Sequence, residues 1–431
     1  MISSDHRTET RGRGVRLRLG SIIFAFGLTL AACTSHRSGE PLNFTGFSMA
    51  TSWSVKVVHP PLDLDVEQLE HELEQIVGSV DERMSTYRPD SEISQFNRSD
   101  STGWFGVSTE TAEVVRLALE VTRRTEGAFD IRIGSLVRLW GFGPAPHPLD
   151  LPDESTLRAG VGALKNSELE SRNSPPALRC RSSDCDLDLS GIAKGFAVDR
   201  LVEHLEQIGI RNYLVEAGGE LRSGGVSGTG KPWKIGIEHP SAAGKSLQRV
   251  LLLKNQAVAT SGDYRIHRTV DGERFPHVLD PRGGRPVRTE VASTTAICDS
   301  AAEADAVATA MMVLGPVRGG IVARREGWPV QWIVRHGDEF VVTSTEDFDP
   351  LTIEGTERNL LSTLLAGFGV IALSMLGLAI GRLFRGRQIL GSCRGKLDPS
   401  ACDECPAISS STPRGFDSTH EGANGRRTQE E

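Results

Sequence analysis

The sequence lacks an excess of positive charge. Its 48 Lys and Arg residues are outnumbered by 56 Asp and Glu residues, which gives a formal net charge of −8. A chain with this balance has no broad cationic surface for a phosphate backbone, so we expect no nucleic-acid partner. Hydrophobic residues at 38% and charged residues at 24% exclude a mostly disordered protein. No repeat of fixed period is visible, and 431 residues allow two or three domains or one large domain with appendages.

Cysteine is also scarce, and seven residues are too few for a disulfide scaffold. They stand at positions 33, 180, 185, 298, 393, 402 and 405. Their clustering indicates separate roles rather than one framework. We expect Cys298 to be a small buried hydrophobic residue.

The N-terminus carries an export signal, predicted over residues 1–32. Four arginines between positions 11 and 18 precede the uncharged run Leu19 to Ala32. This run is shorter than the roughly 20 residues that a membrane-spanning helix needs. Leu30-Ala31-Ala32-Cys33 resembles a bacterial lipobox, so we expect Cys33 to carry a lipid and to begin a linker over 33–43. Ordinary signal cleavage beside a chance cysteine is the alternative.

A second uncharged run, Leu360 to Ile380, has 21 residues and is long enough to span a membrane. We predict a transmembrane helix over 359–381. Acidic residues precede it and basic residues follow it, and basic flanks stay on the cytoplasmic side. We therefore expect a protein of the bacterial inner membrane with a periplasmic main domain and a cytoplasmic tail. Residues 407–431 have few apolar residues, which predicts disorder.

The main domain is predicted to be mixed α+β. Apolar residues recur at three- and four-residue steps over 63–87, which indicates a helix with one buried face. A second helix is expected over 109–126, with Gly127 in the C-cap position. Short runs rich in β-branched or aromatic residues indicate strands near 212–217, 233–238, 249–260, 291–297 and 330–343.

The segment Leu187 to Gly195 has the pattern of a strand that runs into a helix. Such turns aim backbone N–H groups and a helix N-terminus at anions, so Asp188 and Lys194 could hold a nucleotide or its phosphates. A surface ion pair between these two residues is the alternative.

The Ala-rich segment Asp299 to Gly315 places Asp305 and Thr309 four residues apart, on one face of a helix. A buried carboxylate needs a partner, and carboxylate plus hydroxyl oxygens suit Mg²⁺. From the spacing alone, a cation-binding Asp305 and a solvent-facing Asp305 are equally supported.

His277 precedes the turn Asp280-Pro281-Arg282-Gly283-Gly284. Imidazole exchanges protons most readily near neutral pH, so His277 is a candidate general base. A structural, hydrogen-bonding histidine is the alternative.

The order of these segments resembles the ApbE family of FAD:protein FMN transferases over about residues 44–345, and we assign this domain to 44–350. Two stretches depart from the family pattern: Ala50 stands where Gly is usual, and Glu216 to Glu220 replaces Asn-x-Gly-Gly-Asp. The segments that carry the likeness are Met49-Ala50-Thr51, Met84 to Tyr87 with Ser91-Glu92-Ile93, Gly127 to Asp130, Leu139 to Phe142, Asp188 to Asp199, Gly218-Gly219-Glu220, Thr260-Ser261-Gly262, His277 to Gly283, and Ala304-Asp305 to Thr309.

The resemblance implies Mg²⁺-dependent transfer of FMN from the substrate FAD to a Thr or Ser hydroxyl of another protein, with release of AMP. His277 would accept the hydroxyl proton. The resemblance places Mg²⁺ on Asp305, Thr309 and backbone oxygens near Gly191 and Ala308. It places FAD against Met49, Tyr87, Ala128, Phe129, Asp130, Asp188, Lys194 and the backbone near Leu279.

Residues 382–406 resemble a second family, NqrM, a maturation factor of the Na⁺-translocating NADH:quinone oxidoreductase. Cys393, Cys402 and Cys405 carry this likeness, and the resemblance implies iron. Three thiolates are one short of a four-thiolate site. Juxtamembrane acylation or reduced thiols without a role are the alternatives.

The two resemblances together imply that this oxidoreductase supplies the flavin-acceptor subunits. The alternative functions are a Mg²⁺-dependent FAD pyrophosphatase and a non-catalytic flavin-binding membrane scaffold that delivers iron. Cys180 and Cys185 lie in the exported part, where oxidising conditions allow them to form a disulfide.

Overall fold

The computed structural model describes residues 40–353, except 100–101, 145–149, 183, 241–245, 264–265, 289 and 338. All of them belong to the unit of residues 1–355. The predicted export signal, transmembrane helix and disordered tail lie outside the described residues. So do Cys33, Cys393, Cys402 and Cys405.

The centre of the domain is a sheet of eight strands in the order β1-β2-β6-β7-β10-β15-β16-β17. Every paired neighbour in it is antiparallel. Its strands are β1 (Leu42–Ser48), β2 (Thr51–Val57), β6 (Tyr213–Ala217), β7 (Glu220–Gly224), β10 (Ala257–Gly262), β15 (Val291–Cys298), β16 (Val330–His336) and β17 (Glu339–Ser344).

Four smaller sheets surround it, in the orders β3-β5-β4, β18-β9-β8, β11-β12 and β13-β14. Their strands are β3 (Phe105–Gly106), β4 (Leu169–Asn173), β5 (Pro176–Cys180), β8 (Trp233–Glu238), β9 (Leu247–Leu253), β11 (His267–Val270), β12 (Glu273–Pro276), β13 (Leu279–Asp280), β14 (Arg285–Pro286) and β18 (Thr352–Ile353). The helices are α1 (Val66–Met84), α2 (Glu92–Asn97), α3 (Thr109–Arg124), α4 (Gly134–Leu139), α5 (Glu154–Asn166), α6 (Ala193–Gln207), α7 (Ala301–Glu326) and the 3₁₀ helix η1 (Asp349–Leu351).

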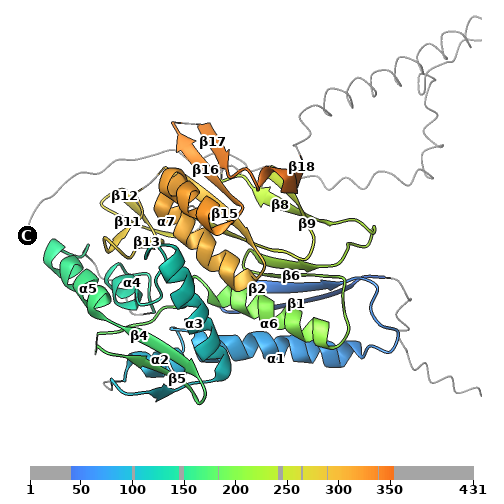
Figure 1. The fold of residues 1–431 in the computed structure, drawn as a ribbon, viewed down its shortest axis with the longest axis horizontal. Helices are drawn as coiled ribbons and strands as arrows, with labels where there is room; N and C mark the ends of the chain where they lie inside the picture. Colours follow the sequence, from blue (N-terminus) through green and yellow to red (C-terminus); the bar gives the residue numbers. More distant parts are fainter. Residues whose placement is uncertain are drawn as a thin grey trace, which may run out of the picture. The chain divides into compact units, whose positions relative to one another are not determined.

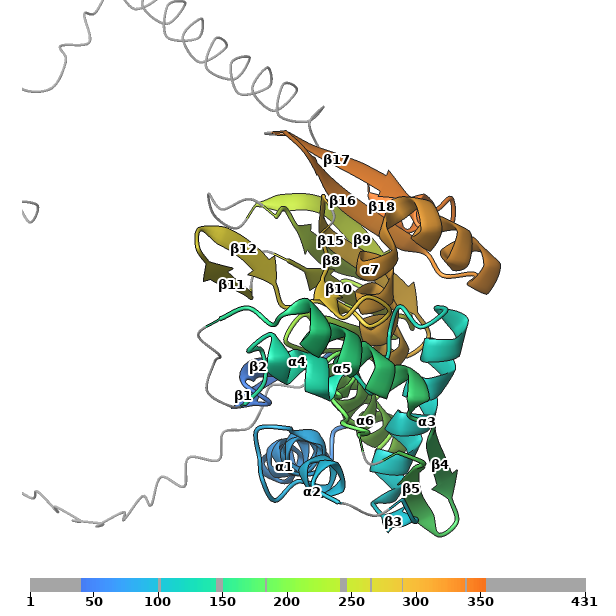
Figure 2. The same cartoon turned by 90° about the vertical axis from the view of Figure 1, so that its left-hand side faces the viewer.

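Helices cover one face of the large sheet (Figures 1 and 2). α7 packs on β10 and β15, α6 packs on α7 and on β6 and β7, and α1 packs on α6. A separate apolar cluster joins β8 and β9 to β10, β15 and β16 through residues such as Ile235, Leu251, Val258, Ile297 and Ile333. The mixed α+β class is confirmed.

Local sequence explains the two helices that were predicted. α1 begins after Asp65, whose carboxylate accepts from the Gln68 N–H, and it buries Leu69, Leu73, Val77, Val80 and Met84. α3 begins after Ser108, and its C-cap is Thr125. Gly127 was expected to be the C-cap but lies two residues after it; its φ is 75° and its N–H donates to the Thr122 carbonyl.

The strand predictions need three corrections. The run 249–260 forms two strands in different sheets, because the chain turns at Asn255 with φ 54°. The run 330–343 is a hairpin, β16 and β17. No strand forms at Leu187, since the Asn97 side chain takes both backbone hydrogen bonds of that residue.

α7 is the only helix of the described residues whose length and composition would let it cross a membrane, and 67% of its most apolar window is buried in the domain. It is therefore the core helix of this fold. Its chain path breaks at Gly315, with φ 67° before Pro316. Gly195 lets α6 approach it closely, because a Cβ there would stand 2.1 Å from the Ala301 carbonyl oxygen.

The two-residue turn between β1 and β2 has a strained backbone. Met49 and Ala50 have φ 52° and 56°, a conformation that favours Gly and costs L-residues about 1–2 kcal/mol. We expect Ala50→Gly to stabilise the domain by about 0.5–1 kcal/mol, since the gain is partly offset by greater freedom of the unfolded chain. Thermal unfolding measures it. Ala163→Gly inside α5 is the matched control and should destabilise by about 1 kcal/mol; a lower unfolding temperature for Ala50→Gly would contradict the prediction.

Candidate functional site

Lys194 is the centre of a group of charges at the start of α6. Its Nζ lies 3.4 Å from Asp305 Oδ2 and 3.6 Å from Glu220 Oε1, and it donates to the Ser190 carbonyl at 3.1 Å. Asp305 also accepts from the Gly195 N–H at 3.3 Å. Three elements meet here: α6 supplies Lys194, α7 supplies Asp305 and β7 supplies Glu220. No contact joins Lys194 to Asp188, so the predicted alternative of an ion pair between these two residues is wrong.

The two carboxylates of this group are buried, Asp305 to 3% exposure and Glu220 to 4%. The alternative of a solvent-facing Asp305 is therefore wrong. Burial raises the pKa of both carboxyls, although Lys194 opposes the rise. Burial would lower the pKa of Lys194, but Asp305 and Glu220 outweigh it and raise that pKa. The pKa of Glu220 rises to about 8, so both carboxyls ionise together near neutral pH only when a further positive charge lies beside them.

Hydroxyl oxygens continue the site along α7. Thr309 lies one turn after Asp305, and its Oγ1 is 3.0 Å from Ser261 Oγ on β10. A Cβ on Gly191 would stand 3.6 Å from Thr309 Oγ1 and 3.2 Å from the Phe129 ring, so that backbone passes close to both side chains. Ala308 is fully buried beside Thr309. The donors here are oxygens, which suits a hard cation.

In the part of the chain that the structure describes, no group of three His, Cys, Asp or Glu side chains that could hold a metal ion is present. A cation would therefore depend on Asp305 together with hydroxyl and backbone oxygens. That donor set is compatible with Mg²⁺, which keeps several waters and needs only one or two carboxylates.

Asp199 holds the site together, although sequence reasoning gave it no role of its own. It is buried, and its two carboxylate oxygens accept from the Ala301 and Ala302 N–H groups at 2.9 Å. Arg222 pairs with the same carboxylate. A carboxylate from α6 thus caps the N-terminus of α7 and fixes the two helices relative to each other.

Asp188 lies in a different place, at the wall of a cavity of about 230 Å³. Its Oδ1 accepts from the Ser190 N–H at 2.8 Å, which folds the segment into a turn. Tyr87 lies nearby: its hydroxyl donates to the Phe142 carbonyl, and burial together with the Asp188 charge raises its pKa. The cavity is also lined by Thr86, Ser94, Asn97, Arg98, Gly134, Val137, Arg138, Gly143, Pro144 and Leu187.

Asp186 shares this region and was not predicted. It forms an ion pair with Arg138, one of the cavity-lining residues. Burial raises the pKa of the Asp186 carboxyl to about 6, with a contribution from Asp188, while Arg138 opposes the rise.

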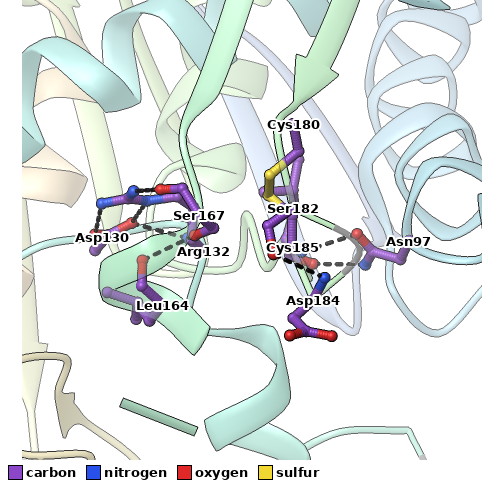
Figure 3. The surroundings of a disulfide bond; sticks show 10 residues. Asn97, Asp130, Arg132, Leu164, Ser167, Cys180, Ser182, Asp184 and Cys185 are labelled. Atoms are coloured by element: carbon purple, nitrogen blue, oxygen red, sulfur yellow. Dashed lines mark hydrogen bonds and ion pairs between the residues drawn. A yellow bond between two sulfur atoms is a disulfide. The ribbon is translucent and has the colours of Figure 1, made fainter. Parts of the chain in front are cut away.

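The amide of Asn97, which Figure 3 labels, holds the backbone of Leu187, the residue before Asp188. Its Nδ2 donates to the Leu187 carbonyl and its Oδ1 accepts from the Leu187 N–H, both at 2.8 Å. We expect Asn97→Ala to destabilise the domain by about 1–3 kcal/mol, since two backbone groups lose their partner. It should also weaken FAD binding by displacing Asp188, measured by flavin fluorescence titration. Asn173→Ala, an exposed residue at the end of β4, is the control; unchanged FAD affinity in Asn97→Ala would contradict the prediction.

Asp130 is engaged with Arg132, as Figure 3 shows. Its Oδ1 accepts from the Arg132 backbone N–H and Nε, both at 2.9 Å. Arg132 in turn bonds the Ser167 carbonyl. The neighbouring Ala128 and Phe129 are buried core residues. Of this predicted group, Phe129 is the residue that the structure brings beside Gly191 and Thr309.

The β1–β2 turn that carries Met49 packs near the side chain of Lys194. A Cβ on Gly218 would stand 3.1 Å from Lys194 Cδ and 3.2 Å from Thr51 Cγ2, so the two turns and the lysine stem pack together. Met49 itself is partly buried against the main core. Leu279 is buried in a separate cluster with Trp140 and Phe275, beside the segment of His277.

His277 carries its proton on Nδ1. That nitrogen lies 3.0 Å from the Ile266 carbonyl oxygen, which can only accept, so the lone pair is on Nε2. Burial and the nearby Lys194 charge lower the pKa of His277, and the carbonyl bond and Asp263 only partly oppose this. A neutral imidazole at pH 7 can accept a proton at Nε2.

Cys180 and Cys185 are joined by a disulfide, with 6.2 Å between their Cα atoms (Figure 3). It ties the end of β5 to the residues just before Asp186. Cys298 is a buried free thiol, as expected, and burial raises its pKa well above the usual value.

Comparison with known proteins identifies the family to which this chain belongs. The profile of the ApbE family matches residues 49–332. The chain belongs to the ApbE family. Curated relatives named FAD:protein FMN transferase are 38% identical over 325 residues in Vibrio cholerae, covering 75% of this chain and 96% of the relative. The relative in Haemophilus influenzae is 36% identical over 343 residues, covering 78% and 98%.

A solved structure described as the flavin transferase ApbE from Vibrio cholerae is also similar. It has a TM-score of 0.67 and 38% identity, and the match covers 73% of this chain and 99% of that one. The predicted family membership is confirmed, and the chain is an enzyme of this family. The NqrM-like segment stays a prediction.

Proposed function

We propose that this enzyme transfers FMN from FAD to a Thr or Ser hydroxyl of an acceptor protein and releases AMP. The names of the relatives support the reaction. The observation that carries it in this chain is the pair of the buried Asp305 and Lys194, with Lys194 near enough to His277 to help lower the pKa of that imidazole. Such a site binds positive charge and phosphate and holds a base ready for a hydroxyl.

In this mechanism the acceptor hydroxyl oxygen attacks the phosphorus of the FMN half of FAD. The new P–O bond forms as the bond to the AMP phosphate oxygen breaks, so AMP leaves with the electron pair of that bond. His277 Nε2 takes the hydroxyl proton. Lys194 orients the phosphates and stabilises the charge that develops on their oxygens.

We further propose that the reaction is Mg²⁺-dependent. Asp305 and Thr309 would hold the ion with backbone oxygens near Gly191 and Ala308, and their oxygen chemistry supports this. When bound, the ion would neutralise charge on the phosphate oxygens.

The acceptor and location are also proposals. We propose subunits of the Na⁺-translocating NADH:quinone oxidoreductase as acceptors, with the catalytic domain in the periplasm, anchored at the inner membrane. The Cys180–Cys185 disulfide supports an oxidising compartment. We propose that Cys33 is lipidated and that Cys393, Cys402 and Cys405 handle iron on the cytoplasmic side.

The test is to incubate the purified full-length chain with FAD, Mg²⁺ and a candidate acceptor subunit, and to follow the acceptor mass. A mass increase of one FMN with AMP in equal amount supports the transferase. Free FMN without acceptor labelling would instead support the FAD pyrophosphatase. Binding of FAD with no turnover would support the scaffold.

A further inference from the structure

Lys194 has a second carboxylate partner that the mechanism above does not use. Its Nζ is 3.4 Å from Asp305 Oδ2, which is assigned to the cation, and 3.6 Å from Glu220 Oε1. Two positive groups, Lys194 and the proposed cation, would therefore compete for the Asp305 carboxylate. Among the described residues, Lys194 is the only cation that pairs with Glu220.

Glu220 is held rigidly in this position. It is the first residue of β7 and pairs with Ala217 across the turn Gly218-Gly219. Its side chain is 5% exposed, and its buried Oε2 has no hydrogen-bond partner among the described residues. The stem of Lys194 runs along the same turn, since a Cβ on Gly218 would stand 3.1 Å from Lys194 Cδ. The ammonium thus lies at similar distances from Glu220 and Asp305.

Glu220 affects the charge balance around Lys194 when a cation binds Asp305. If Asp305 were the sole anion beside Lys194, the two would form a neutral ion pair. A divalent cation that bound Asp305 would then take away the partner of the ammonium, which would stand unpaired beside a dication. Like charges at such distances repel strongly in a buried site. With Glu220 present, the ammonium keeps a carboxylate while Asp305 passes to the cation.

We propose that Glu220 is a positioning residue that holds Lys194 when a divalent cation occupies Asp305, so that lysine and cation can both face the phosphates. The inference rests on the proposed function for the place of the cation. It assigns to Glu220 control of cation affinity, with little effect on the chemical step once the cation is bound.

The experiment measures Mn²⁺ binding to the full-length chain by electron paramagnetic resonance, without FAD or acceptor. We expect the Glu220→Gln variant to bind Mn²⁺ about tenfold more weakly, because the ammonium of Lys194 then has no second carboxylate to pair with while the cation is bound to Asp305. The Mg²⁺ concentration for half-maximal FMN transfer should rise by a similar factor, while kcat at saturating Mg²⁺ changes by less than about threefold. Glu220→Asp keeps the charge and should restore most of the affinity.

Glu216→Gln is the matched control. Glu216 lies on the same hairpin, but its carboxylate accepts from the Gly219 N–H and from Ser54 rather than from Lys194. Unchanged Mn²⁺ affinity in Glu220→Gln, equal weakening in both variants, or a loss of kcat that saturating Mg²⁺ does not restore would each overturn the inference. So would a wild-type chain that binds no Mn²⁺. Wild-type Mn²⁺ binding without any FMN transfer would instead count against the proposed function alone.

Discussion

Replacement of Asp305 by Asn is expected to lower the rate of FMN transfer by about 10³-fold or more, because a cation that neutralises phosphate charge is worth several kcal/mol. The variant should keep its fold. Asn retains an oxygen for the Gly195 N–H, and Lys194 retains Glu220. The measurement is single-turnover labelling of the acceptor at saturating FAD.

Thermal unfolding supplies the control for Asp305→Asn. The folded-state pKa of Asp305 is raised above its ordinary value, so the ionised carboxylate costs stability at neutral pH. Removing that charge should leave the unfolding temperature unchanged or higher, as is common for groups that serve activity. Loss of activity together with a clearly lower unfolding temperature would contradict a role in cation binding.

Replacement of His277 by Ala is expected to lower kcat/KM by about 10²–10⁴-fold at pH 7, the range of a general base. The pH profile carries more information. The base must be neutral, and burial lowers the pKa of His277 below its ordinary value of 6.5. The wild-type kcat/KM should therefore fall only below about pH 6.5, as His277 becomes protonated, and His277→Ala should lose this acid limb.

His267 provides a matched control for this measurement. It lies on β11 in the same region, and its side chain is exposed. His267→Ala should keep both the rate and the acid limb. An acid limb that persists in His277→Ala would assign the titration to another group and remove His277 from the role of base.

Much of the fold could be predicted from local patterns. The apolar spacing over 63–87 forms α1, and Ser108 begins α3, because amphipathic periodicity and caps act within a few residues. The segment at Leu187 could not be predicted in this way. Its apolar residues resemble a strand, yet Asn97, 90 residues earlier in the chain, takes the backbone hydrogen bonds.

The candidate site shows the same division. The helical spacing placed Asp305 and Thr309 on one face but left a buried and a solvent-facing Asp305 level, and packing of α7 decided for burial. In the sequence, Glu220 is distinguished only as part of a motif that departs from the family pattern. Its contact with Lys194 depends on a hairpin turn that no local signal connects to α6.

The sequence by itself determined the mixed α+β class, the family and most of the residues that deserve mutation, since periodicity, caps and motif order are properties of short stretches. Only the tertiary structure decided which charges meet. Lys194 and Asp305 are 111 positions apart, and their contact exists because Gly195 lets α6 approach α7 and Asp199 holds the end of that helix. Burial then raises the pKa of both carboxyls that surround this ammonium. These shifts depend on the folded surroundings, so the amino-acid composition could not predict them.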